Sequence, residues 1–486
     1  MRSRKTENRQ IISDNLKYRE DKFFKFMNSD RYQYTESSVY LRNNMENFKA
    51  VFDVFIRMKD KNDFGIMNGI EEILELIDIL NETRPEIRKG YLKKILDDRD
   101  LIEYLAHIKF KGDVKGVRNG EIVFTNEPVL TIKAPLIQAK ILETPILNIL
   151  NHHILTSTAA ARIVMEAGDK KVLFFGTRRS AGFEGAMAST KAAYITGCDG
   201  HASIMGEYSY NWKSTGTMTH AYVQTFGMSK EGEYRAFDLF IKENMIKKGP
   251  LIMLIDTYDT LGSGIDNAID AFKNNNISDS YEGIYGIRID SGKLSDYADI
   301  CKKKLEKSGL NNAKIILTGG LDKDKIREMI KKNTNVDIFG VGDAISLPDN
   351  TVSLVYKMSK INGQNVMKIS NNKDKMSYPG SKEIYRIEYE NDLRDYIKLE
   401  DEKADPEIGM ITADVEYRRK LTLEYMRSGE KNLENCELLS LENSRDYFME
   451  NRKSLEKIYN NRDVERVFFS EEIKGLKEKL IGNIKE

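Results

Sequence analysis

Short apolar runs that end in glycine or aspartate recur between residues 171 and 342. The runs are VLFFG at 172–176, LIMLID at 251–256, IYGIRID at 284–290, KIILTGG at 314–320 and DIFGVG at 337–342. The last four begin 33, 30 and 23 residues apart, and segments with helical patterning lie between them. Strands that alternate with helices at this spacing are typical of parallel sheets with crossover helices. The pattern therefore predicts an α/β fold for this part of the chain.

The segments on either side have other patterns. Residues 50–58 alternate as a strand does, and residues 69–80 have the spacing of an amphipathic helix. Asn-Gly dipeptides at 119 and 362 each separate two β-like stretches, which predicts two hairpins. Helices rich in Lys and Glu are expected from about residue 416 onwards. Both flanks are therefore expected to be α+β.

Composition and charge exclude several classes of protein. The 486 residues contain 76 Lys+Arg and 76 Asp+Glu, so the formal charge at pH 7 is zero and no global basic field attracts nucleic acid. An apolar content of 40% supports a sizeable core in two or three folding units. No apolar run approaches the roughly 20 residues that span a bilayer, and the charged N-terminus resembles neither a signal nor a transit peptide. We expect a soluble cytoplasmic protein that binds neither nucleic acid nor membranes.

Polar residues that follow the apolar runs are candidates for chemistry, because ligands bind at the carboxyl ends of parallel strands. Arg178 and Arg179 can hold phosphate or carboxylate oxygens through paired N–H groups, although two adjacent arginines are more often a surface pair. Asp256, Asp259 and Asp290 can hold Mg²⁺ or ribose hydroxyls, or can stabilise a cationic transition state. Each of these aspartates can equally be a helix N-cap.

Glycines and one histidine are the other candidates. Gly319, Gly320, Gly340 and Gly342 offer backbone N–H groups beside predicted helix starts, where barrels bind phosphate, but glycines there also suit tight turns. His220, in GTMTHAYV, is one of five histidines. A lone histidine is more often structural than catalytic. The residues alone leave these alternatives open.

Taken together, the motifs make the chain similar to nicotinate phosphoribosyltransferases over nearly its whole length. The matching stretches are SDRYQYTESSVYL from 29, LETPILNILN at 142–151, FGTRRS at 175–180, AAYITGCDG at 192–200, GTMTHAYV at 216–223, LIDTYDTLGSG at 254–264, IRIDSG at 287–292, TGGLD at 318–322, FGVGD at 339–343 and KISNNKDKMSYPGSKEIYR at 368–386. Their order and spacing make the resemblance specific. It implies an irregular, TIM-like α/β barrel at 136–349, joined to an α+β domain formed by both chain termini, 1–135 and 350–486.

The resemblance also implies the reaction. Phosphoribose passes from phosphoribosyl pyrophosphate to nicotinate, giving nicotinate mononucleotide and pyrophosphate, and ATP hydrolysis drives the transfer through a transient phosphohistidine. Mg²⁺ is the expected cofactor and ATP a co-substrate. The three scattered cysteines support neither a disulfide framework nor a Cys-ligated zinc site. The family implies a homodimer with shared active sites, to which Tyr32 contributes from the neighbouring subunit.

Roles follow from the matching positions. The resemblance makes His220 the phosphorylated residue and assigns catalysis to it together with Asp256 and Asp290. It implies that Phe175 and Arg178 hold the pyridine ring. Further substrate contacts, with the glycines directed at the 5′-phosphate, are expected from Arg179, Thr217, Arg288, Ser291, Gly319, Gly320, Gly340 and Gly342.

Departures from the family pattern leave two alternatives. Many members have Thr-Ser-Asn where this chain has His201-Ala202-Ser203, and Lys293 and Asp343 also replace commoner residues. Asp199 lies near the stretch where amide-using relatives have an acidic residue, so a nicotinamide phosphoribosyltransferase is the first alternative. A catalytically inactive barrel that acts as a binding protein is the second. An unrelated phosphate-binding barrel such as an aldolase is disfavoured, because no lysine ends a predicted strand where it could form a Schiff base.

Overall fold

The computed structural model describes residues 22–60, 63–349, 351–371, 376–390, 392–403, 415–459 and 464–485. The chain forms two compact units. Unit 1 contains the described residues up to Leu155 together with those that follow residue 350, and unit 2 is Thr156–Asp349. The first boundary expected from the sequence is 135/136, whereas the two units separate inside helix α8 (Glu143–Ala167).

Unit 1 is built on a seven-stranded antiparallel sheet in the order β13-β12-β1-β5-β3-β17-β18, with a four-stranded sheet, β16-β14-β15-β19, and a two-stranded sheet, β2-β4. The strands are β1 (Lys49–Met58), β2 (Phe64–Ile66), β3 (Asp113–Val117), β4 (Ile122–Phe124), β5 (Pro128–Pro135), β12 (Val352–Ile361), β13 (Gln364–Asn365), β14 (Lys382–Tyr389), β15 (Asp392–Leu399), β16 (Val415–Lys420), β17 (Thr422–Arg427), β18 (Glu430–Lys431) and β19 (Val467–Phe469). β1 lies between β5 and β12, so both ends of the chain share one sheet, as the resemblance implies.

The helices of unit 1 bury the apolar stripes that the sequence shows. In α4, the side chains of Ile73, Ile77 and Leu80 recur every three or four residues and are buried, which confirms the predicted helix at 69–80. The helices are α2 (Lys22–Phe26), α3 (Arg31–Arg42), α4 (Ile70–Glu82), α5 (Pro85–Leu92), α6 (Arg99–His107), α7 (Leu136–Ile141), α17 (Leu433–Glu437), α18 (Leu441–Tyr459) and α19 (Glu471–Lys485). Within the described parts of both units, no helix combines the length and apolar character needed to cross a membrane.

The two Asn-Gly turns have different outcomes. At 362 the hairpin is confirmed, because Asn362 and Gly363 have φ values of 50° and 84° and join β12 to β13. At 119 a tight hairpin is wrong, because β4, the next strand, pairs with β2. β3 pairs instead with β5, further along the second stretch, and with β17. Gly120 (φ 84°) turns the chain from one sheet into another, and a Cβ on it would lie 2.6 Å from the Ser444 carbonyl oxygen. This turn therefore serves tertiary packing and not a local hairpin.

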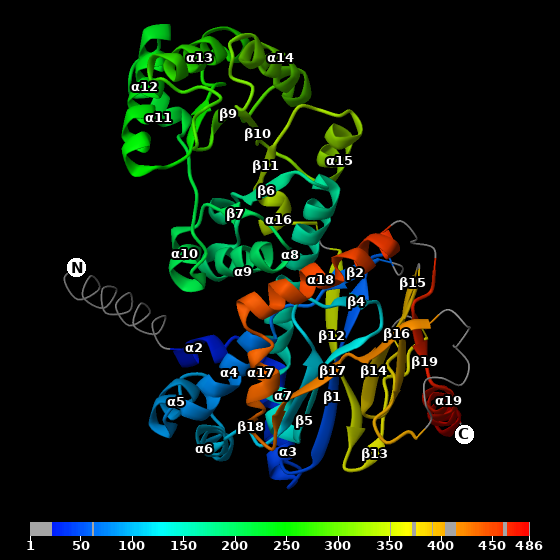
Figure 1. The fold of residues 1–486 in the computed structure, drawn as a ribbon. Coiled ribbons are helices and arrows are strands. Elements are labelled where there is room, and N and C mark those ends of the chain that lie inside the picture. The colour runs from blue at the N-terminus through cyan, green and yellow to red at the C-terminus, as the bar shows by residue number, and fades with distance from the viewer. Residues whose placement is uncertain are drawn as a thin grey trace, which may run out of the picture. The chain divides into compact units, whose positions relative to one another are not determined.

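Unit 2 is an open α/β barrel of six parallel strands (Figure 1). The order β7-β6-β11-β10-β9-β8 is the chain order read as a circle and broken between β7 and β8. The five apolar runs coincide with β6, β8, β9, β10 and β11, which confirms the α/β class; β7 has only two residues and leaves no pattern. The elements are β6 (Lys171–Phe174), η1 (Thr177–Arg179), α9 (Gly182–Ile195), β7 (Gly200–His201), α10 (Ile204–Tyr210), α11 (His220–Gln224), α12 (Lys230–Lys247), β8 (Leu251–Leu254), η2 (Thr260–Gly264), α13 (Ile265–Asn274), β9 (Tyr285–Ile289), α14 (Leu294–Lys307), β10 (Lys314–Leu317), α15 (Lys323–Lys331), β11 (Ile338–Val341) and α16 (Asp343–Ser346).

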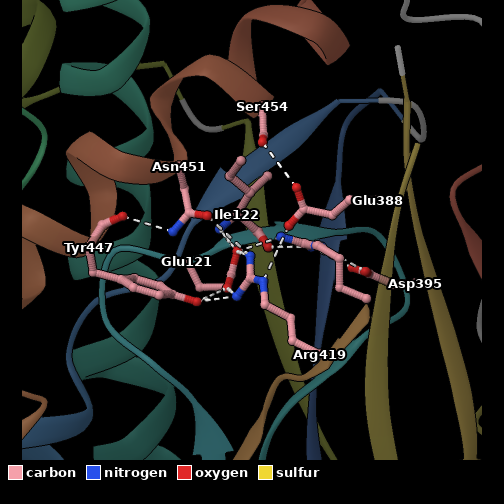
Figure 2. Close-up of polar contacts among 9 residues, drawn as sticks. Glu121, Ile122, Glu388, Asp395, Arg419, Tyr447, Asn451 and Ser454 are labelled. Atoms are coloured by element: carbon pink, nitrogen blue, oxygen red, sulfur yellow. Dashed lines mark hydrogen bonds and ion pairs between the residues drawn. The ribbon is translucent and has the colours of Figure 1, made fainter. Parts of the chain in front are cut away.

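Inside unit 1, a buried ionic network connects the segment before β4 with residues of the C-terminal half of the chain. Figure 2 shows Glu121, just before β4, facing Arg419 of β16 and the Tyr447 hydroxyl of α18. The guanidinium of Arg386 bonds Glu121 and grips both oxygens of Asp395 (2.8 and 2.5 Å). Burial alone would raise the pKa of Glu121, but Arg386 and Arg419 outweigh it and lower this pKa to about 2.

We expect Glu121→Gln to destabilise unit 1 by about 3–5 kcal/mol at pH 7, because Arg386 and Arg419 lose the buried carboxylate that they share. The parent should also lose stability as the pH falls from 4.5 towards 2, since the folded carboxyl has a pKa below its ordinary value of 4.5 and protonation opposes folding. The variant should lack this contribution. Urea unfolding at pH 7 and pH 3 checks both points, with Glu430→Gln on the exposed β18 as the control. Equal stability of Glu121→Gln and the parent at pH 7 would contradict the expectation.

Candidate active site

The carboxyl ends of the unit 2 strands carry most of the predicted site residues. Phe175 follows β6, Asp256 follows β8, Asp290 follows β9, Gly319 follows β10 and Gly342 follows β11. Because the strands are parallel, these ends lie at one edge of the sheet. Hydrogen bonds join neighbouring loops there, for example from the Phe175 amide to the Val341 carbonyl (2.7 Å).

Two carboxylates at this edge are each held by a hydroxyl from a neighbouring loop. The Ser291 hydroxyl donates to Asp256 Oδ2 (2.6 Å), and the Thr318 hydroxyl donates to Asp290 Oδ1. The other oxygen of Asp256, Oδ1, is buried and has no protein partner among the described residues. A buried acceptor without a partner is costly, so this atom suits a ligand or a cation.

Arg288 is a half-buried cation of the site. Its Nη1 donates to Thr217 Oγ1 (2.9 Å) and its Nη2 donates to the Met218 carbonyl (3.0 Å), whereas Nε is buried without a partner in the part of the chain that the structure describes. Burial lowers the pKa of Arg288; the two nearby carboxylates oppose this shift, and Arg178 adds to it. Arginine nevertheless stays charged at neutral pH. The site therefore holds a partly desolvated cation close to two carboxylates.

The segment after β6 carries Phe175 and the two arginines. Residues Thr177–Arg179 form the 3₁₀ turn η1, and the side chains of Arg178 and Arg179 are exposed. Arg178 is close enough to Arg288 to affect the pKa of that residue. The hydroxyl of Thr177 is buried and lacks a partner within the described residues. The turn thus presents two guanidinium groups to solvent at the end of a central strand.

The four glycines differ in how much space surrounds the position of a Cβ atom. Gly319 has φ 89°, and a Cβ there would lie 1.7 Å from the Asp290 carbonyl oxygen; a Cβ on Gly340 would lie 2.4 Å from a neighbouring side chain. Steric crowding alone accounts for these two. The Cβ positions of Gly320 and Gly342 have no atom closer than 3.7 Å and 3.6 Å. Open space beside the backbone at these two positions suits the approach of a phosphate.

His220 and His201 have opposite environments. His220 begins α11 and is half-buried, and its Nδ1 lies 3.1 Å from the hydroxyl of Thr257, the residue after Asp256. His201 is fully buried, and both of its ring nitrogens have backbone partners. Of these two histidines, only His220 has a ring that an external phosphate can reach.

Some predicted residues lie elsewhere or have simpler roles. Asp199 Oδ2 accepts from the Val172 amide (2.9 Å) near the start of β6, the opposite end of that strand from Phe175. Asp259 is the N-cap of η2, which is the structural alternative that the sequence left open for it. Tyr32 lies on α3 of unit 1 with 41% of its surface exposed.

Sequence reasoning missed three residues that hold the site together. The Thr257 hydroxyl contacts His220, and the Thr318 hydroxyl contacts Asp290. The Met218 carbonyl accepts a hydrogen bond from Arg288. The only available signal was that each lies in a motif beside a predicted residue. Threonines and backbone carbonyls are too common for that signal to single them out.

The residues present fit Mg²⁺ bound through a diphosphate. Among the described residues, no group of three or more His, Cys, Asp or Glu side chains could hold a metal ion. Mg²⁺ usually keeps several waters and needs only one or two carboxylates plus substrate phosphates. Asp256, with its unpartnered Oδ1, and the nearby Asp290 offer such carboxylates.

Comparisons with known proteins identify related enzymes. Residues 27–151 match the model of the nicotinate phosphoribosyltransferase (NAPRTase) N-terminal domain family. The chain is 33% identical to nicotinate phosphoribosyltransferase of Bacillus subtilis (strain 168) over 389 residues, 78% of this chain and 77% of the relative. It is 30% identical over 410 residues to nicotinate phosphoribosyltransferase pncB1 of Mycobacterium tuberculosis, covering 83% and 86%. The crystal structure of human nicotinic acid phosphoribosyltransferase has the same fold, with a TM-score of 0.76, 21% identity, and coverage of 93% of this chain and 99% of that one.

Proposed function

The chain belongs to the nicotinate phosphoribosyltransferase family and is an enzyme with that activity, and we propose that it couples the transfer to ATP by phosphorylating His220. The transfer consumes phosphoribosyl pyrophosphate and nicotinate and yields nicotinate mononucleotide and pyrophosphate. One observation supports the site assignment best. Asp256, Asp290 and Arg288 converge at one sheet edge, where Asp256 and Arg288 each have a buried polar atom without a partner among the described residues.

The transfer step requires charge stabilisation and no general base. Breaking the bond between C1 and pyrophosphate builds positive charge on the ribose, which Asp256 and Asp290 stabilise, while Arg288 neutralises the leaving group. The lone pair of the pyridine nitrogen forms the new bond to C1, and the nitrogen becomes a pyridinium. When bound, Mg²⁺ supplies a Lewis acid for the diphosphate oxygens.

The ATP-coupled step uses His220 beside the same groups. An imidazole nitrogen attacks the γ-phosphorus of ATP, the Pγ–O bond breaks, and ADP leaves. The new negative charge then lies two residues from Met218, whose carbonyl Arg288 holds. We expect this charge to rearrange the contacts of Arg288 and to tighten binding of phosphoribosyl pyrophosphate. Hydrolysis of the phosphohistidine after turnover releases phosphate and resets the enzyme.

A homodimer with shared active sites is the second part of the proposal. The ring of Tyr32 has Lys140 Nζ 4.8 Å from its centroid, and Lys140 is in turn fixed by Glu36 and Glu143, at 3.0 Å each. An exposed aromatic ring with a fixed orientation suits stacking on a pyridine bound by another subunit.

Nicotinate should be preferred to nicotinamide by about ten- to a hundredfold in kcat/KM. An amide leaves a cation at the end of β6 without its counter-charge, which costs on the order of 1–3 kcal/mol. This preference is supported by Asp199, whose carboxylate accepts a hydrogen bond from the Val172 amide at the end of β6 away from Phe175. Steady-state assays with both substrates and ATP measure the ratio, and Arg178→Ala should reduce it. A nicotinamide value equal to or above that of nicotinate overturns the assignment.

A further inference from the structure

One irregular loop carries Thr217 and leads into His220. Residues 211–219 form no helix or strand and connect α10 to α11, on the path from β7 to β8. These two strands are the unpaired edges of the open barrel. The loop therefore belongs to the connection that passes the open side of the barrel, and its conformation decides where Thr217 and His220 lie.

The loop is fastened at two ends. At its C-terminal end, Arg288 of β9 holds Thr217 and the Met218 carbonyl. At its N-terminal end, the Thr215 amide donates to the His201 carbonyl of β7 (2.7 Å), and Ser214 donates to Glu207 of α10 through its amide (2.9 Å) and its hydroxyl. The loop is thus tied to both sides of the opening.

A ring stack and a hydrogen bond join His201 to Trp212 in this loop. The His201 ring is fully buried and stacks on the Trp212 indole, with ring centroids 4.2 Å apart and planes at 23°. His201 Nδ1 accepts from the Ser203 amide (3.2 Å), so the proton resides on Nε2, which donates to the Trp212 carbonyl at 2.5 Å. Burial lowers the pKa of His201, with the Glu207 carboxylate acting in the opposite direction. A neutral imidazole in one tautomer matches these partners.

We propose that His201 and Trp212 form a clamp that positions the 211–219 loop, so that His201 is a positioning residue for Thr217, Arg288 and His220. The inference rests on the proposed roles of those three residues. It explains the His201-Ala202-Ser203 departure, because a planar ring with an Nε2 donor is what the Trp212 side chain and carbonyl require. Without the clamp, substrate has to order the N-terminal part of the loop around Trp212, at a cost in binding.

Kinetics without ATP test the clamp independently of phosphorylation. We expect His201→Ala to raise the KM for phosphoribosyl pyrophosphate about ten- to a hundredfold, because the unpaired Trp212 carbonyl and the freed loop weaken that half of the site. The KM for nicotinate should change much less, because Phe175 and Arg178 belong to the β6 turn. Gln can donate from Nε2 to the same carbonyl, so His201→Gln should recover most of the loss. His107→Gln, on the exposed end of α6, is the matched control.

Fluorescence provides a second readout, because Trp212 is the only tryptophan. We expect His201→Ala to shift the emission to longer wavelength and to increase quenching by acrylamide, and phosphoribosyl pyrophosphate to reverse both changes. If His201→Ala fails to fold, as judged by circular dichroism, Trp212→Ala serves instead and should raise the same KM. An unchanged KM for phosphoribosyl pyrophosphate in folded His201→Ala or Trp212→Ala overturns the clamp. Loss of γ-phosphate labelling in His220→Ala bears only on the phosphorylation proposal, so the two ideas fail separately.

Discussion

A His220→Ala enzyme is expected to lose the acid-labile, base-stable label that γ-labelled ATP leaves on the parent. The imidazole nitrogen is the phosphoryl acceptor in this proposal, and alanine offers none. Transfer without ATP should persist, since Asp256, Asp290 and Arg288 are unchanged. ATP should no longer stimulate kcat/KM, a loss of about ten- to a hundredfold if the coupling free energy is typical. Labelling followed by base and acid treatment, with steady-state kinetics with and without ATP, measures both effects.

Two histidines serve as controls for this experiment. His107→Ala tests labelling of an exposed surface ring. His201→Gln tests the other candidate acceptor, which the structure buries with both nitrogens bonded, and it should keep the label. Labelling of His220→Ala equal to that of the parent rules out His220 as the acceptor. Loss of label in His201→Gln alone would move the acceptor to His201.

Mixing Tyr32→Ala chains with Arg178→Ala chains should restore activity that neither variant has alone. In a shared site, Arg178 belongs to one subunit and Tyr32 to its neighbour, so a mixed dimer has one intact site and one doubly altered site. Each variant alone should lose about tenfold or more in kcat/KM, through a lost ring stack or a lost charge partner. Random exchange makes half of the dimers mixed, so about a quarter of the parent activity should return.

The mixing experiment requires proof that subunits exchange. Differently tagged chains that co-purify after mixing give that proof, and Glu430→Gln chains mixed with Tyr32→Ala chains give the matched control. A mixture that exchanges yet stays as inactive as its components contradicts the shared site. A chain that remains monomeric at assay concentration contradicts the dimer itself.

The strands of unit 2 were predictable because their signal is local. Strands covered on both faces need continuous apolar residues, so the runs at 251–256 and 284–290 indicate β8 and β9 without any knowledge of their neighbours. The positions of Asp256 and Asp290 follow, since each comes directly after its run. The Asn119 turn shows the limit. A dipeptide that favours a turn cannot tell which sheet the next strand joins.

The partners of the site residues were not predictable, because they are distant in sequence. Thr318 lies 28 residues from Asp290, and Thr217 lies 71 residues from Arg288. The network of Figure 2 spans more still, with Arg419 298 residues from Glu121. Which hydroxyl or carboxylate meets which side chain depends on how strands align, and many common residues could fill each position.

By itself the sequence determines the α/β class, the strand ends at which Arg178, Asp256 and Asp290 lie, and the family to which their motifs point. Each of these depends on residues within a few positions of one another. Only the tertiary structure decides that the His201 ring is buried against the Trp212 ring, whereas the His220 ring stays partly exposed. An imidazole has the same intrinsic chemistry at both positions. Burial and hydrogen-bond partners, which long-range packing sets, distinguish the positioning role proposed for His201 from the reactive role proposed for His220.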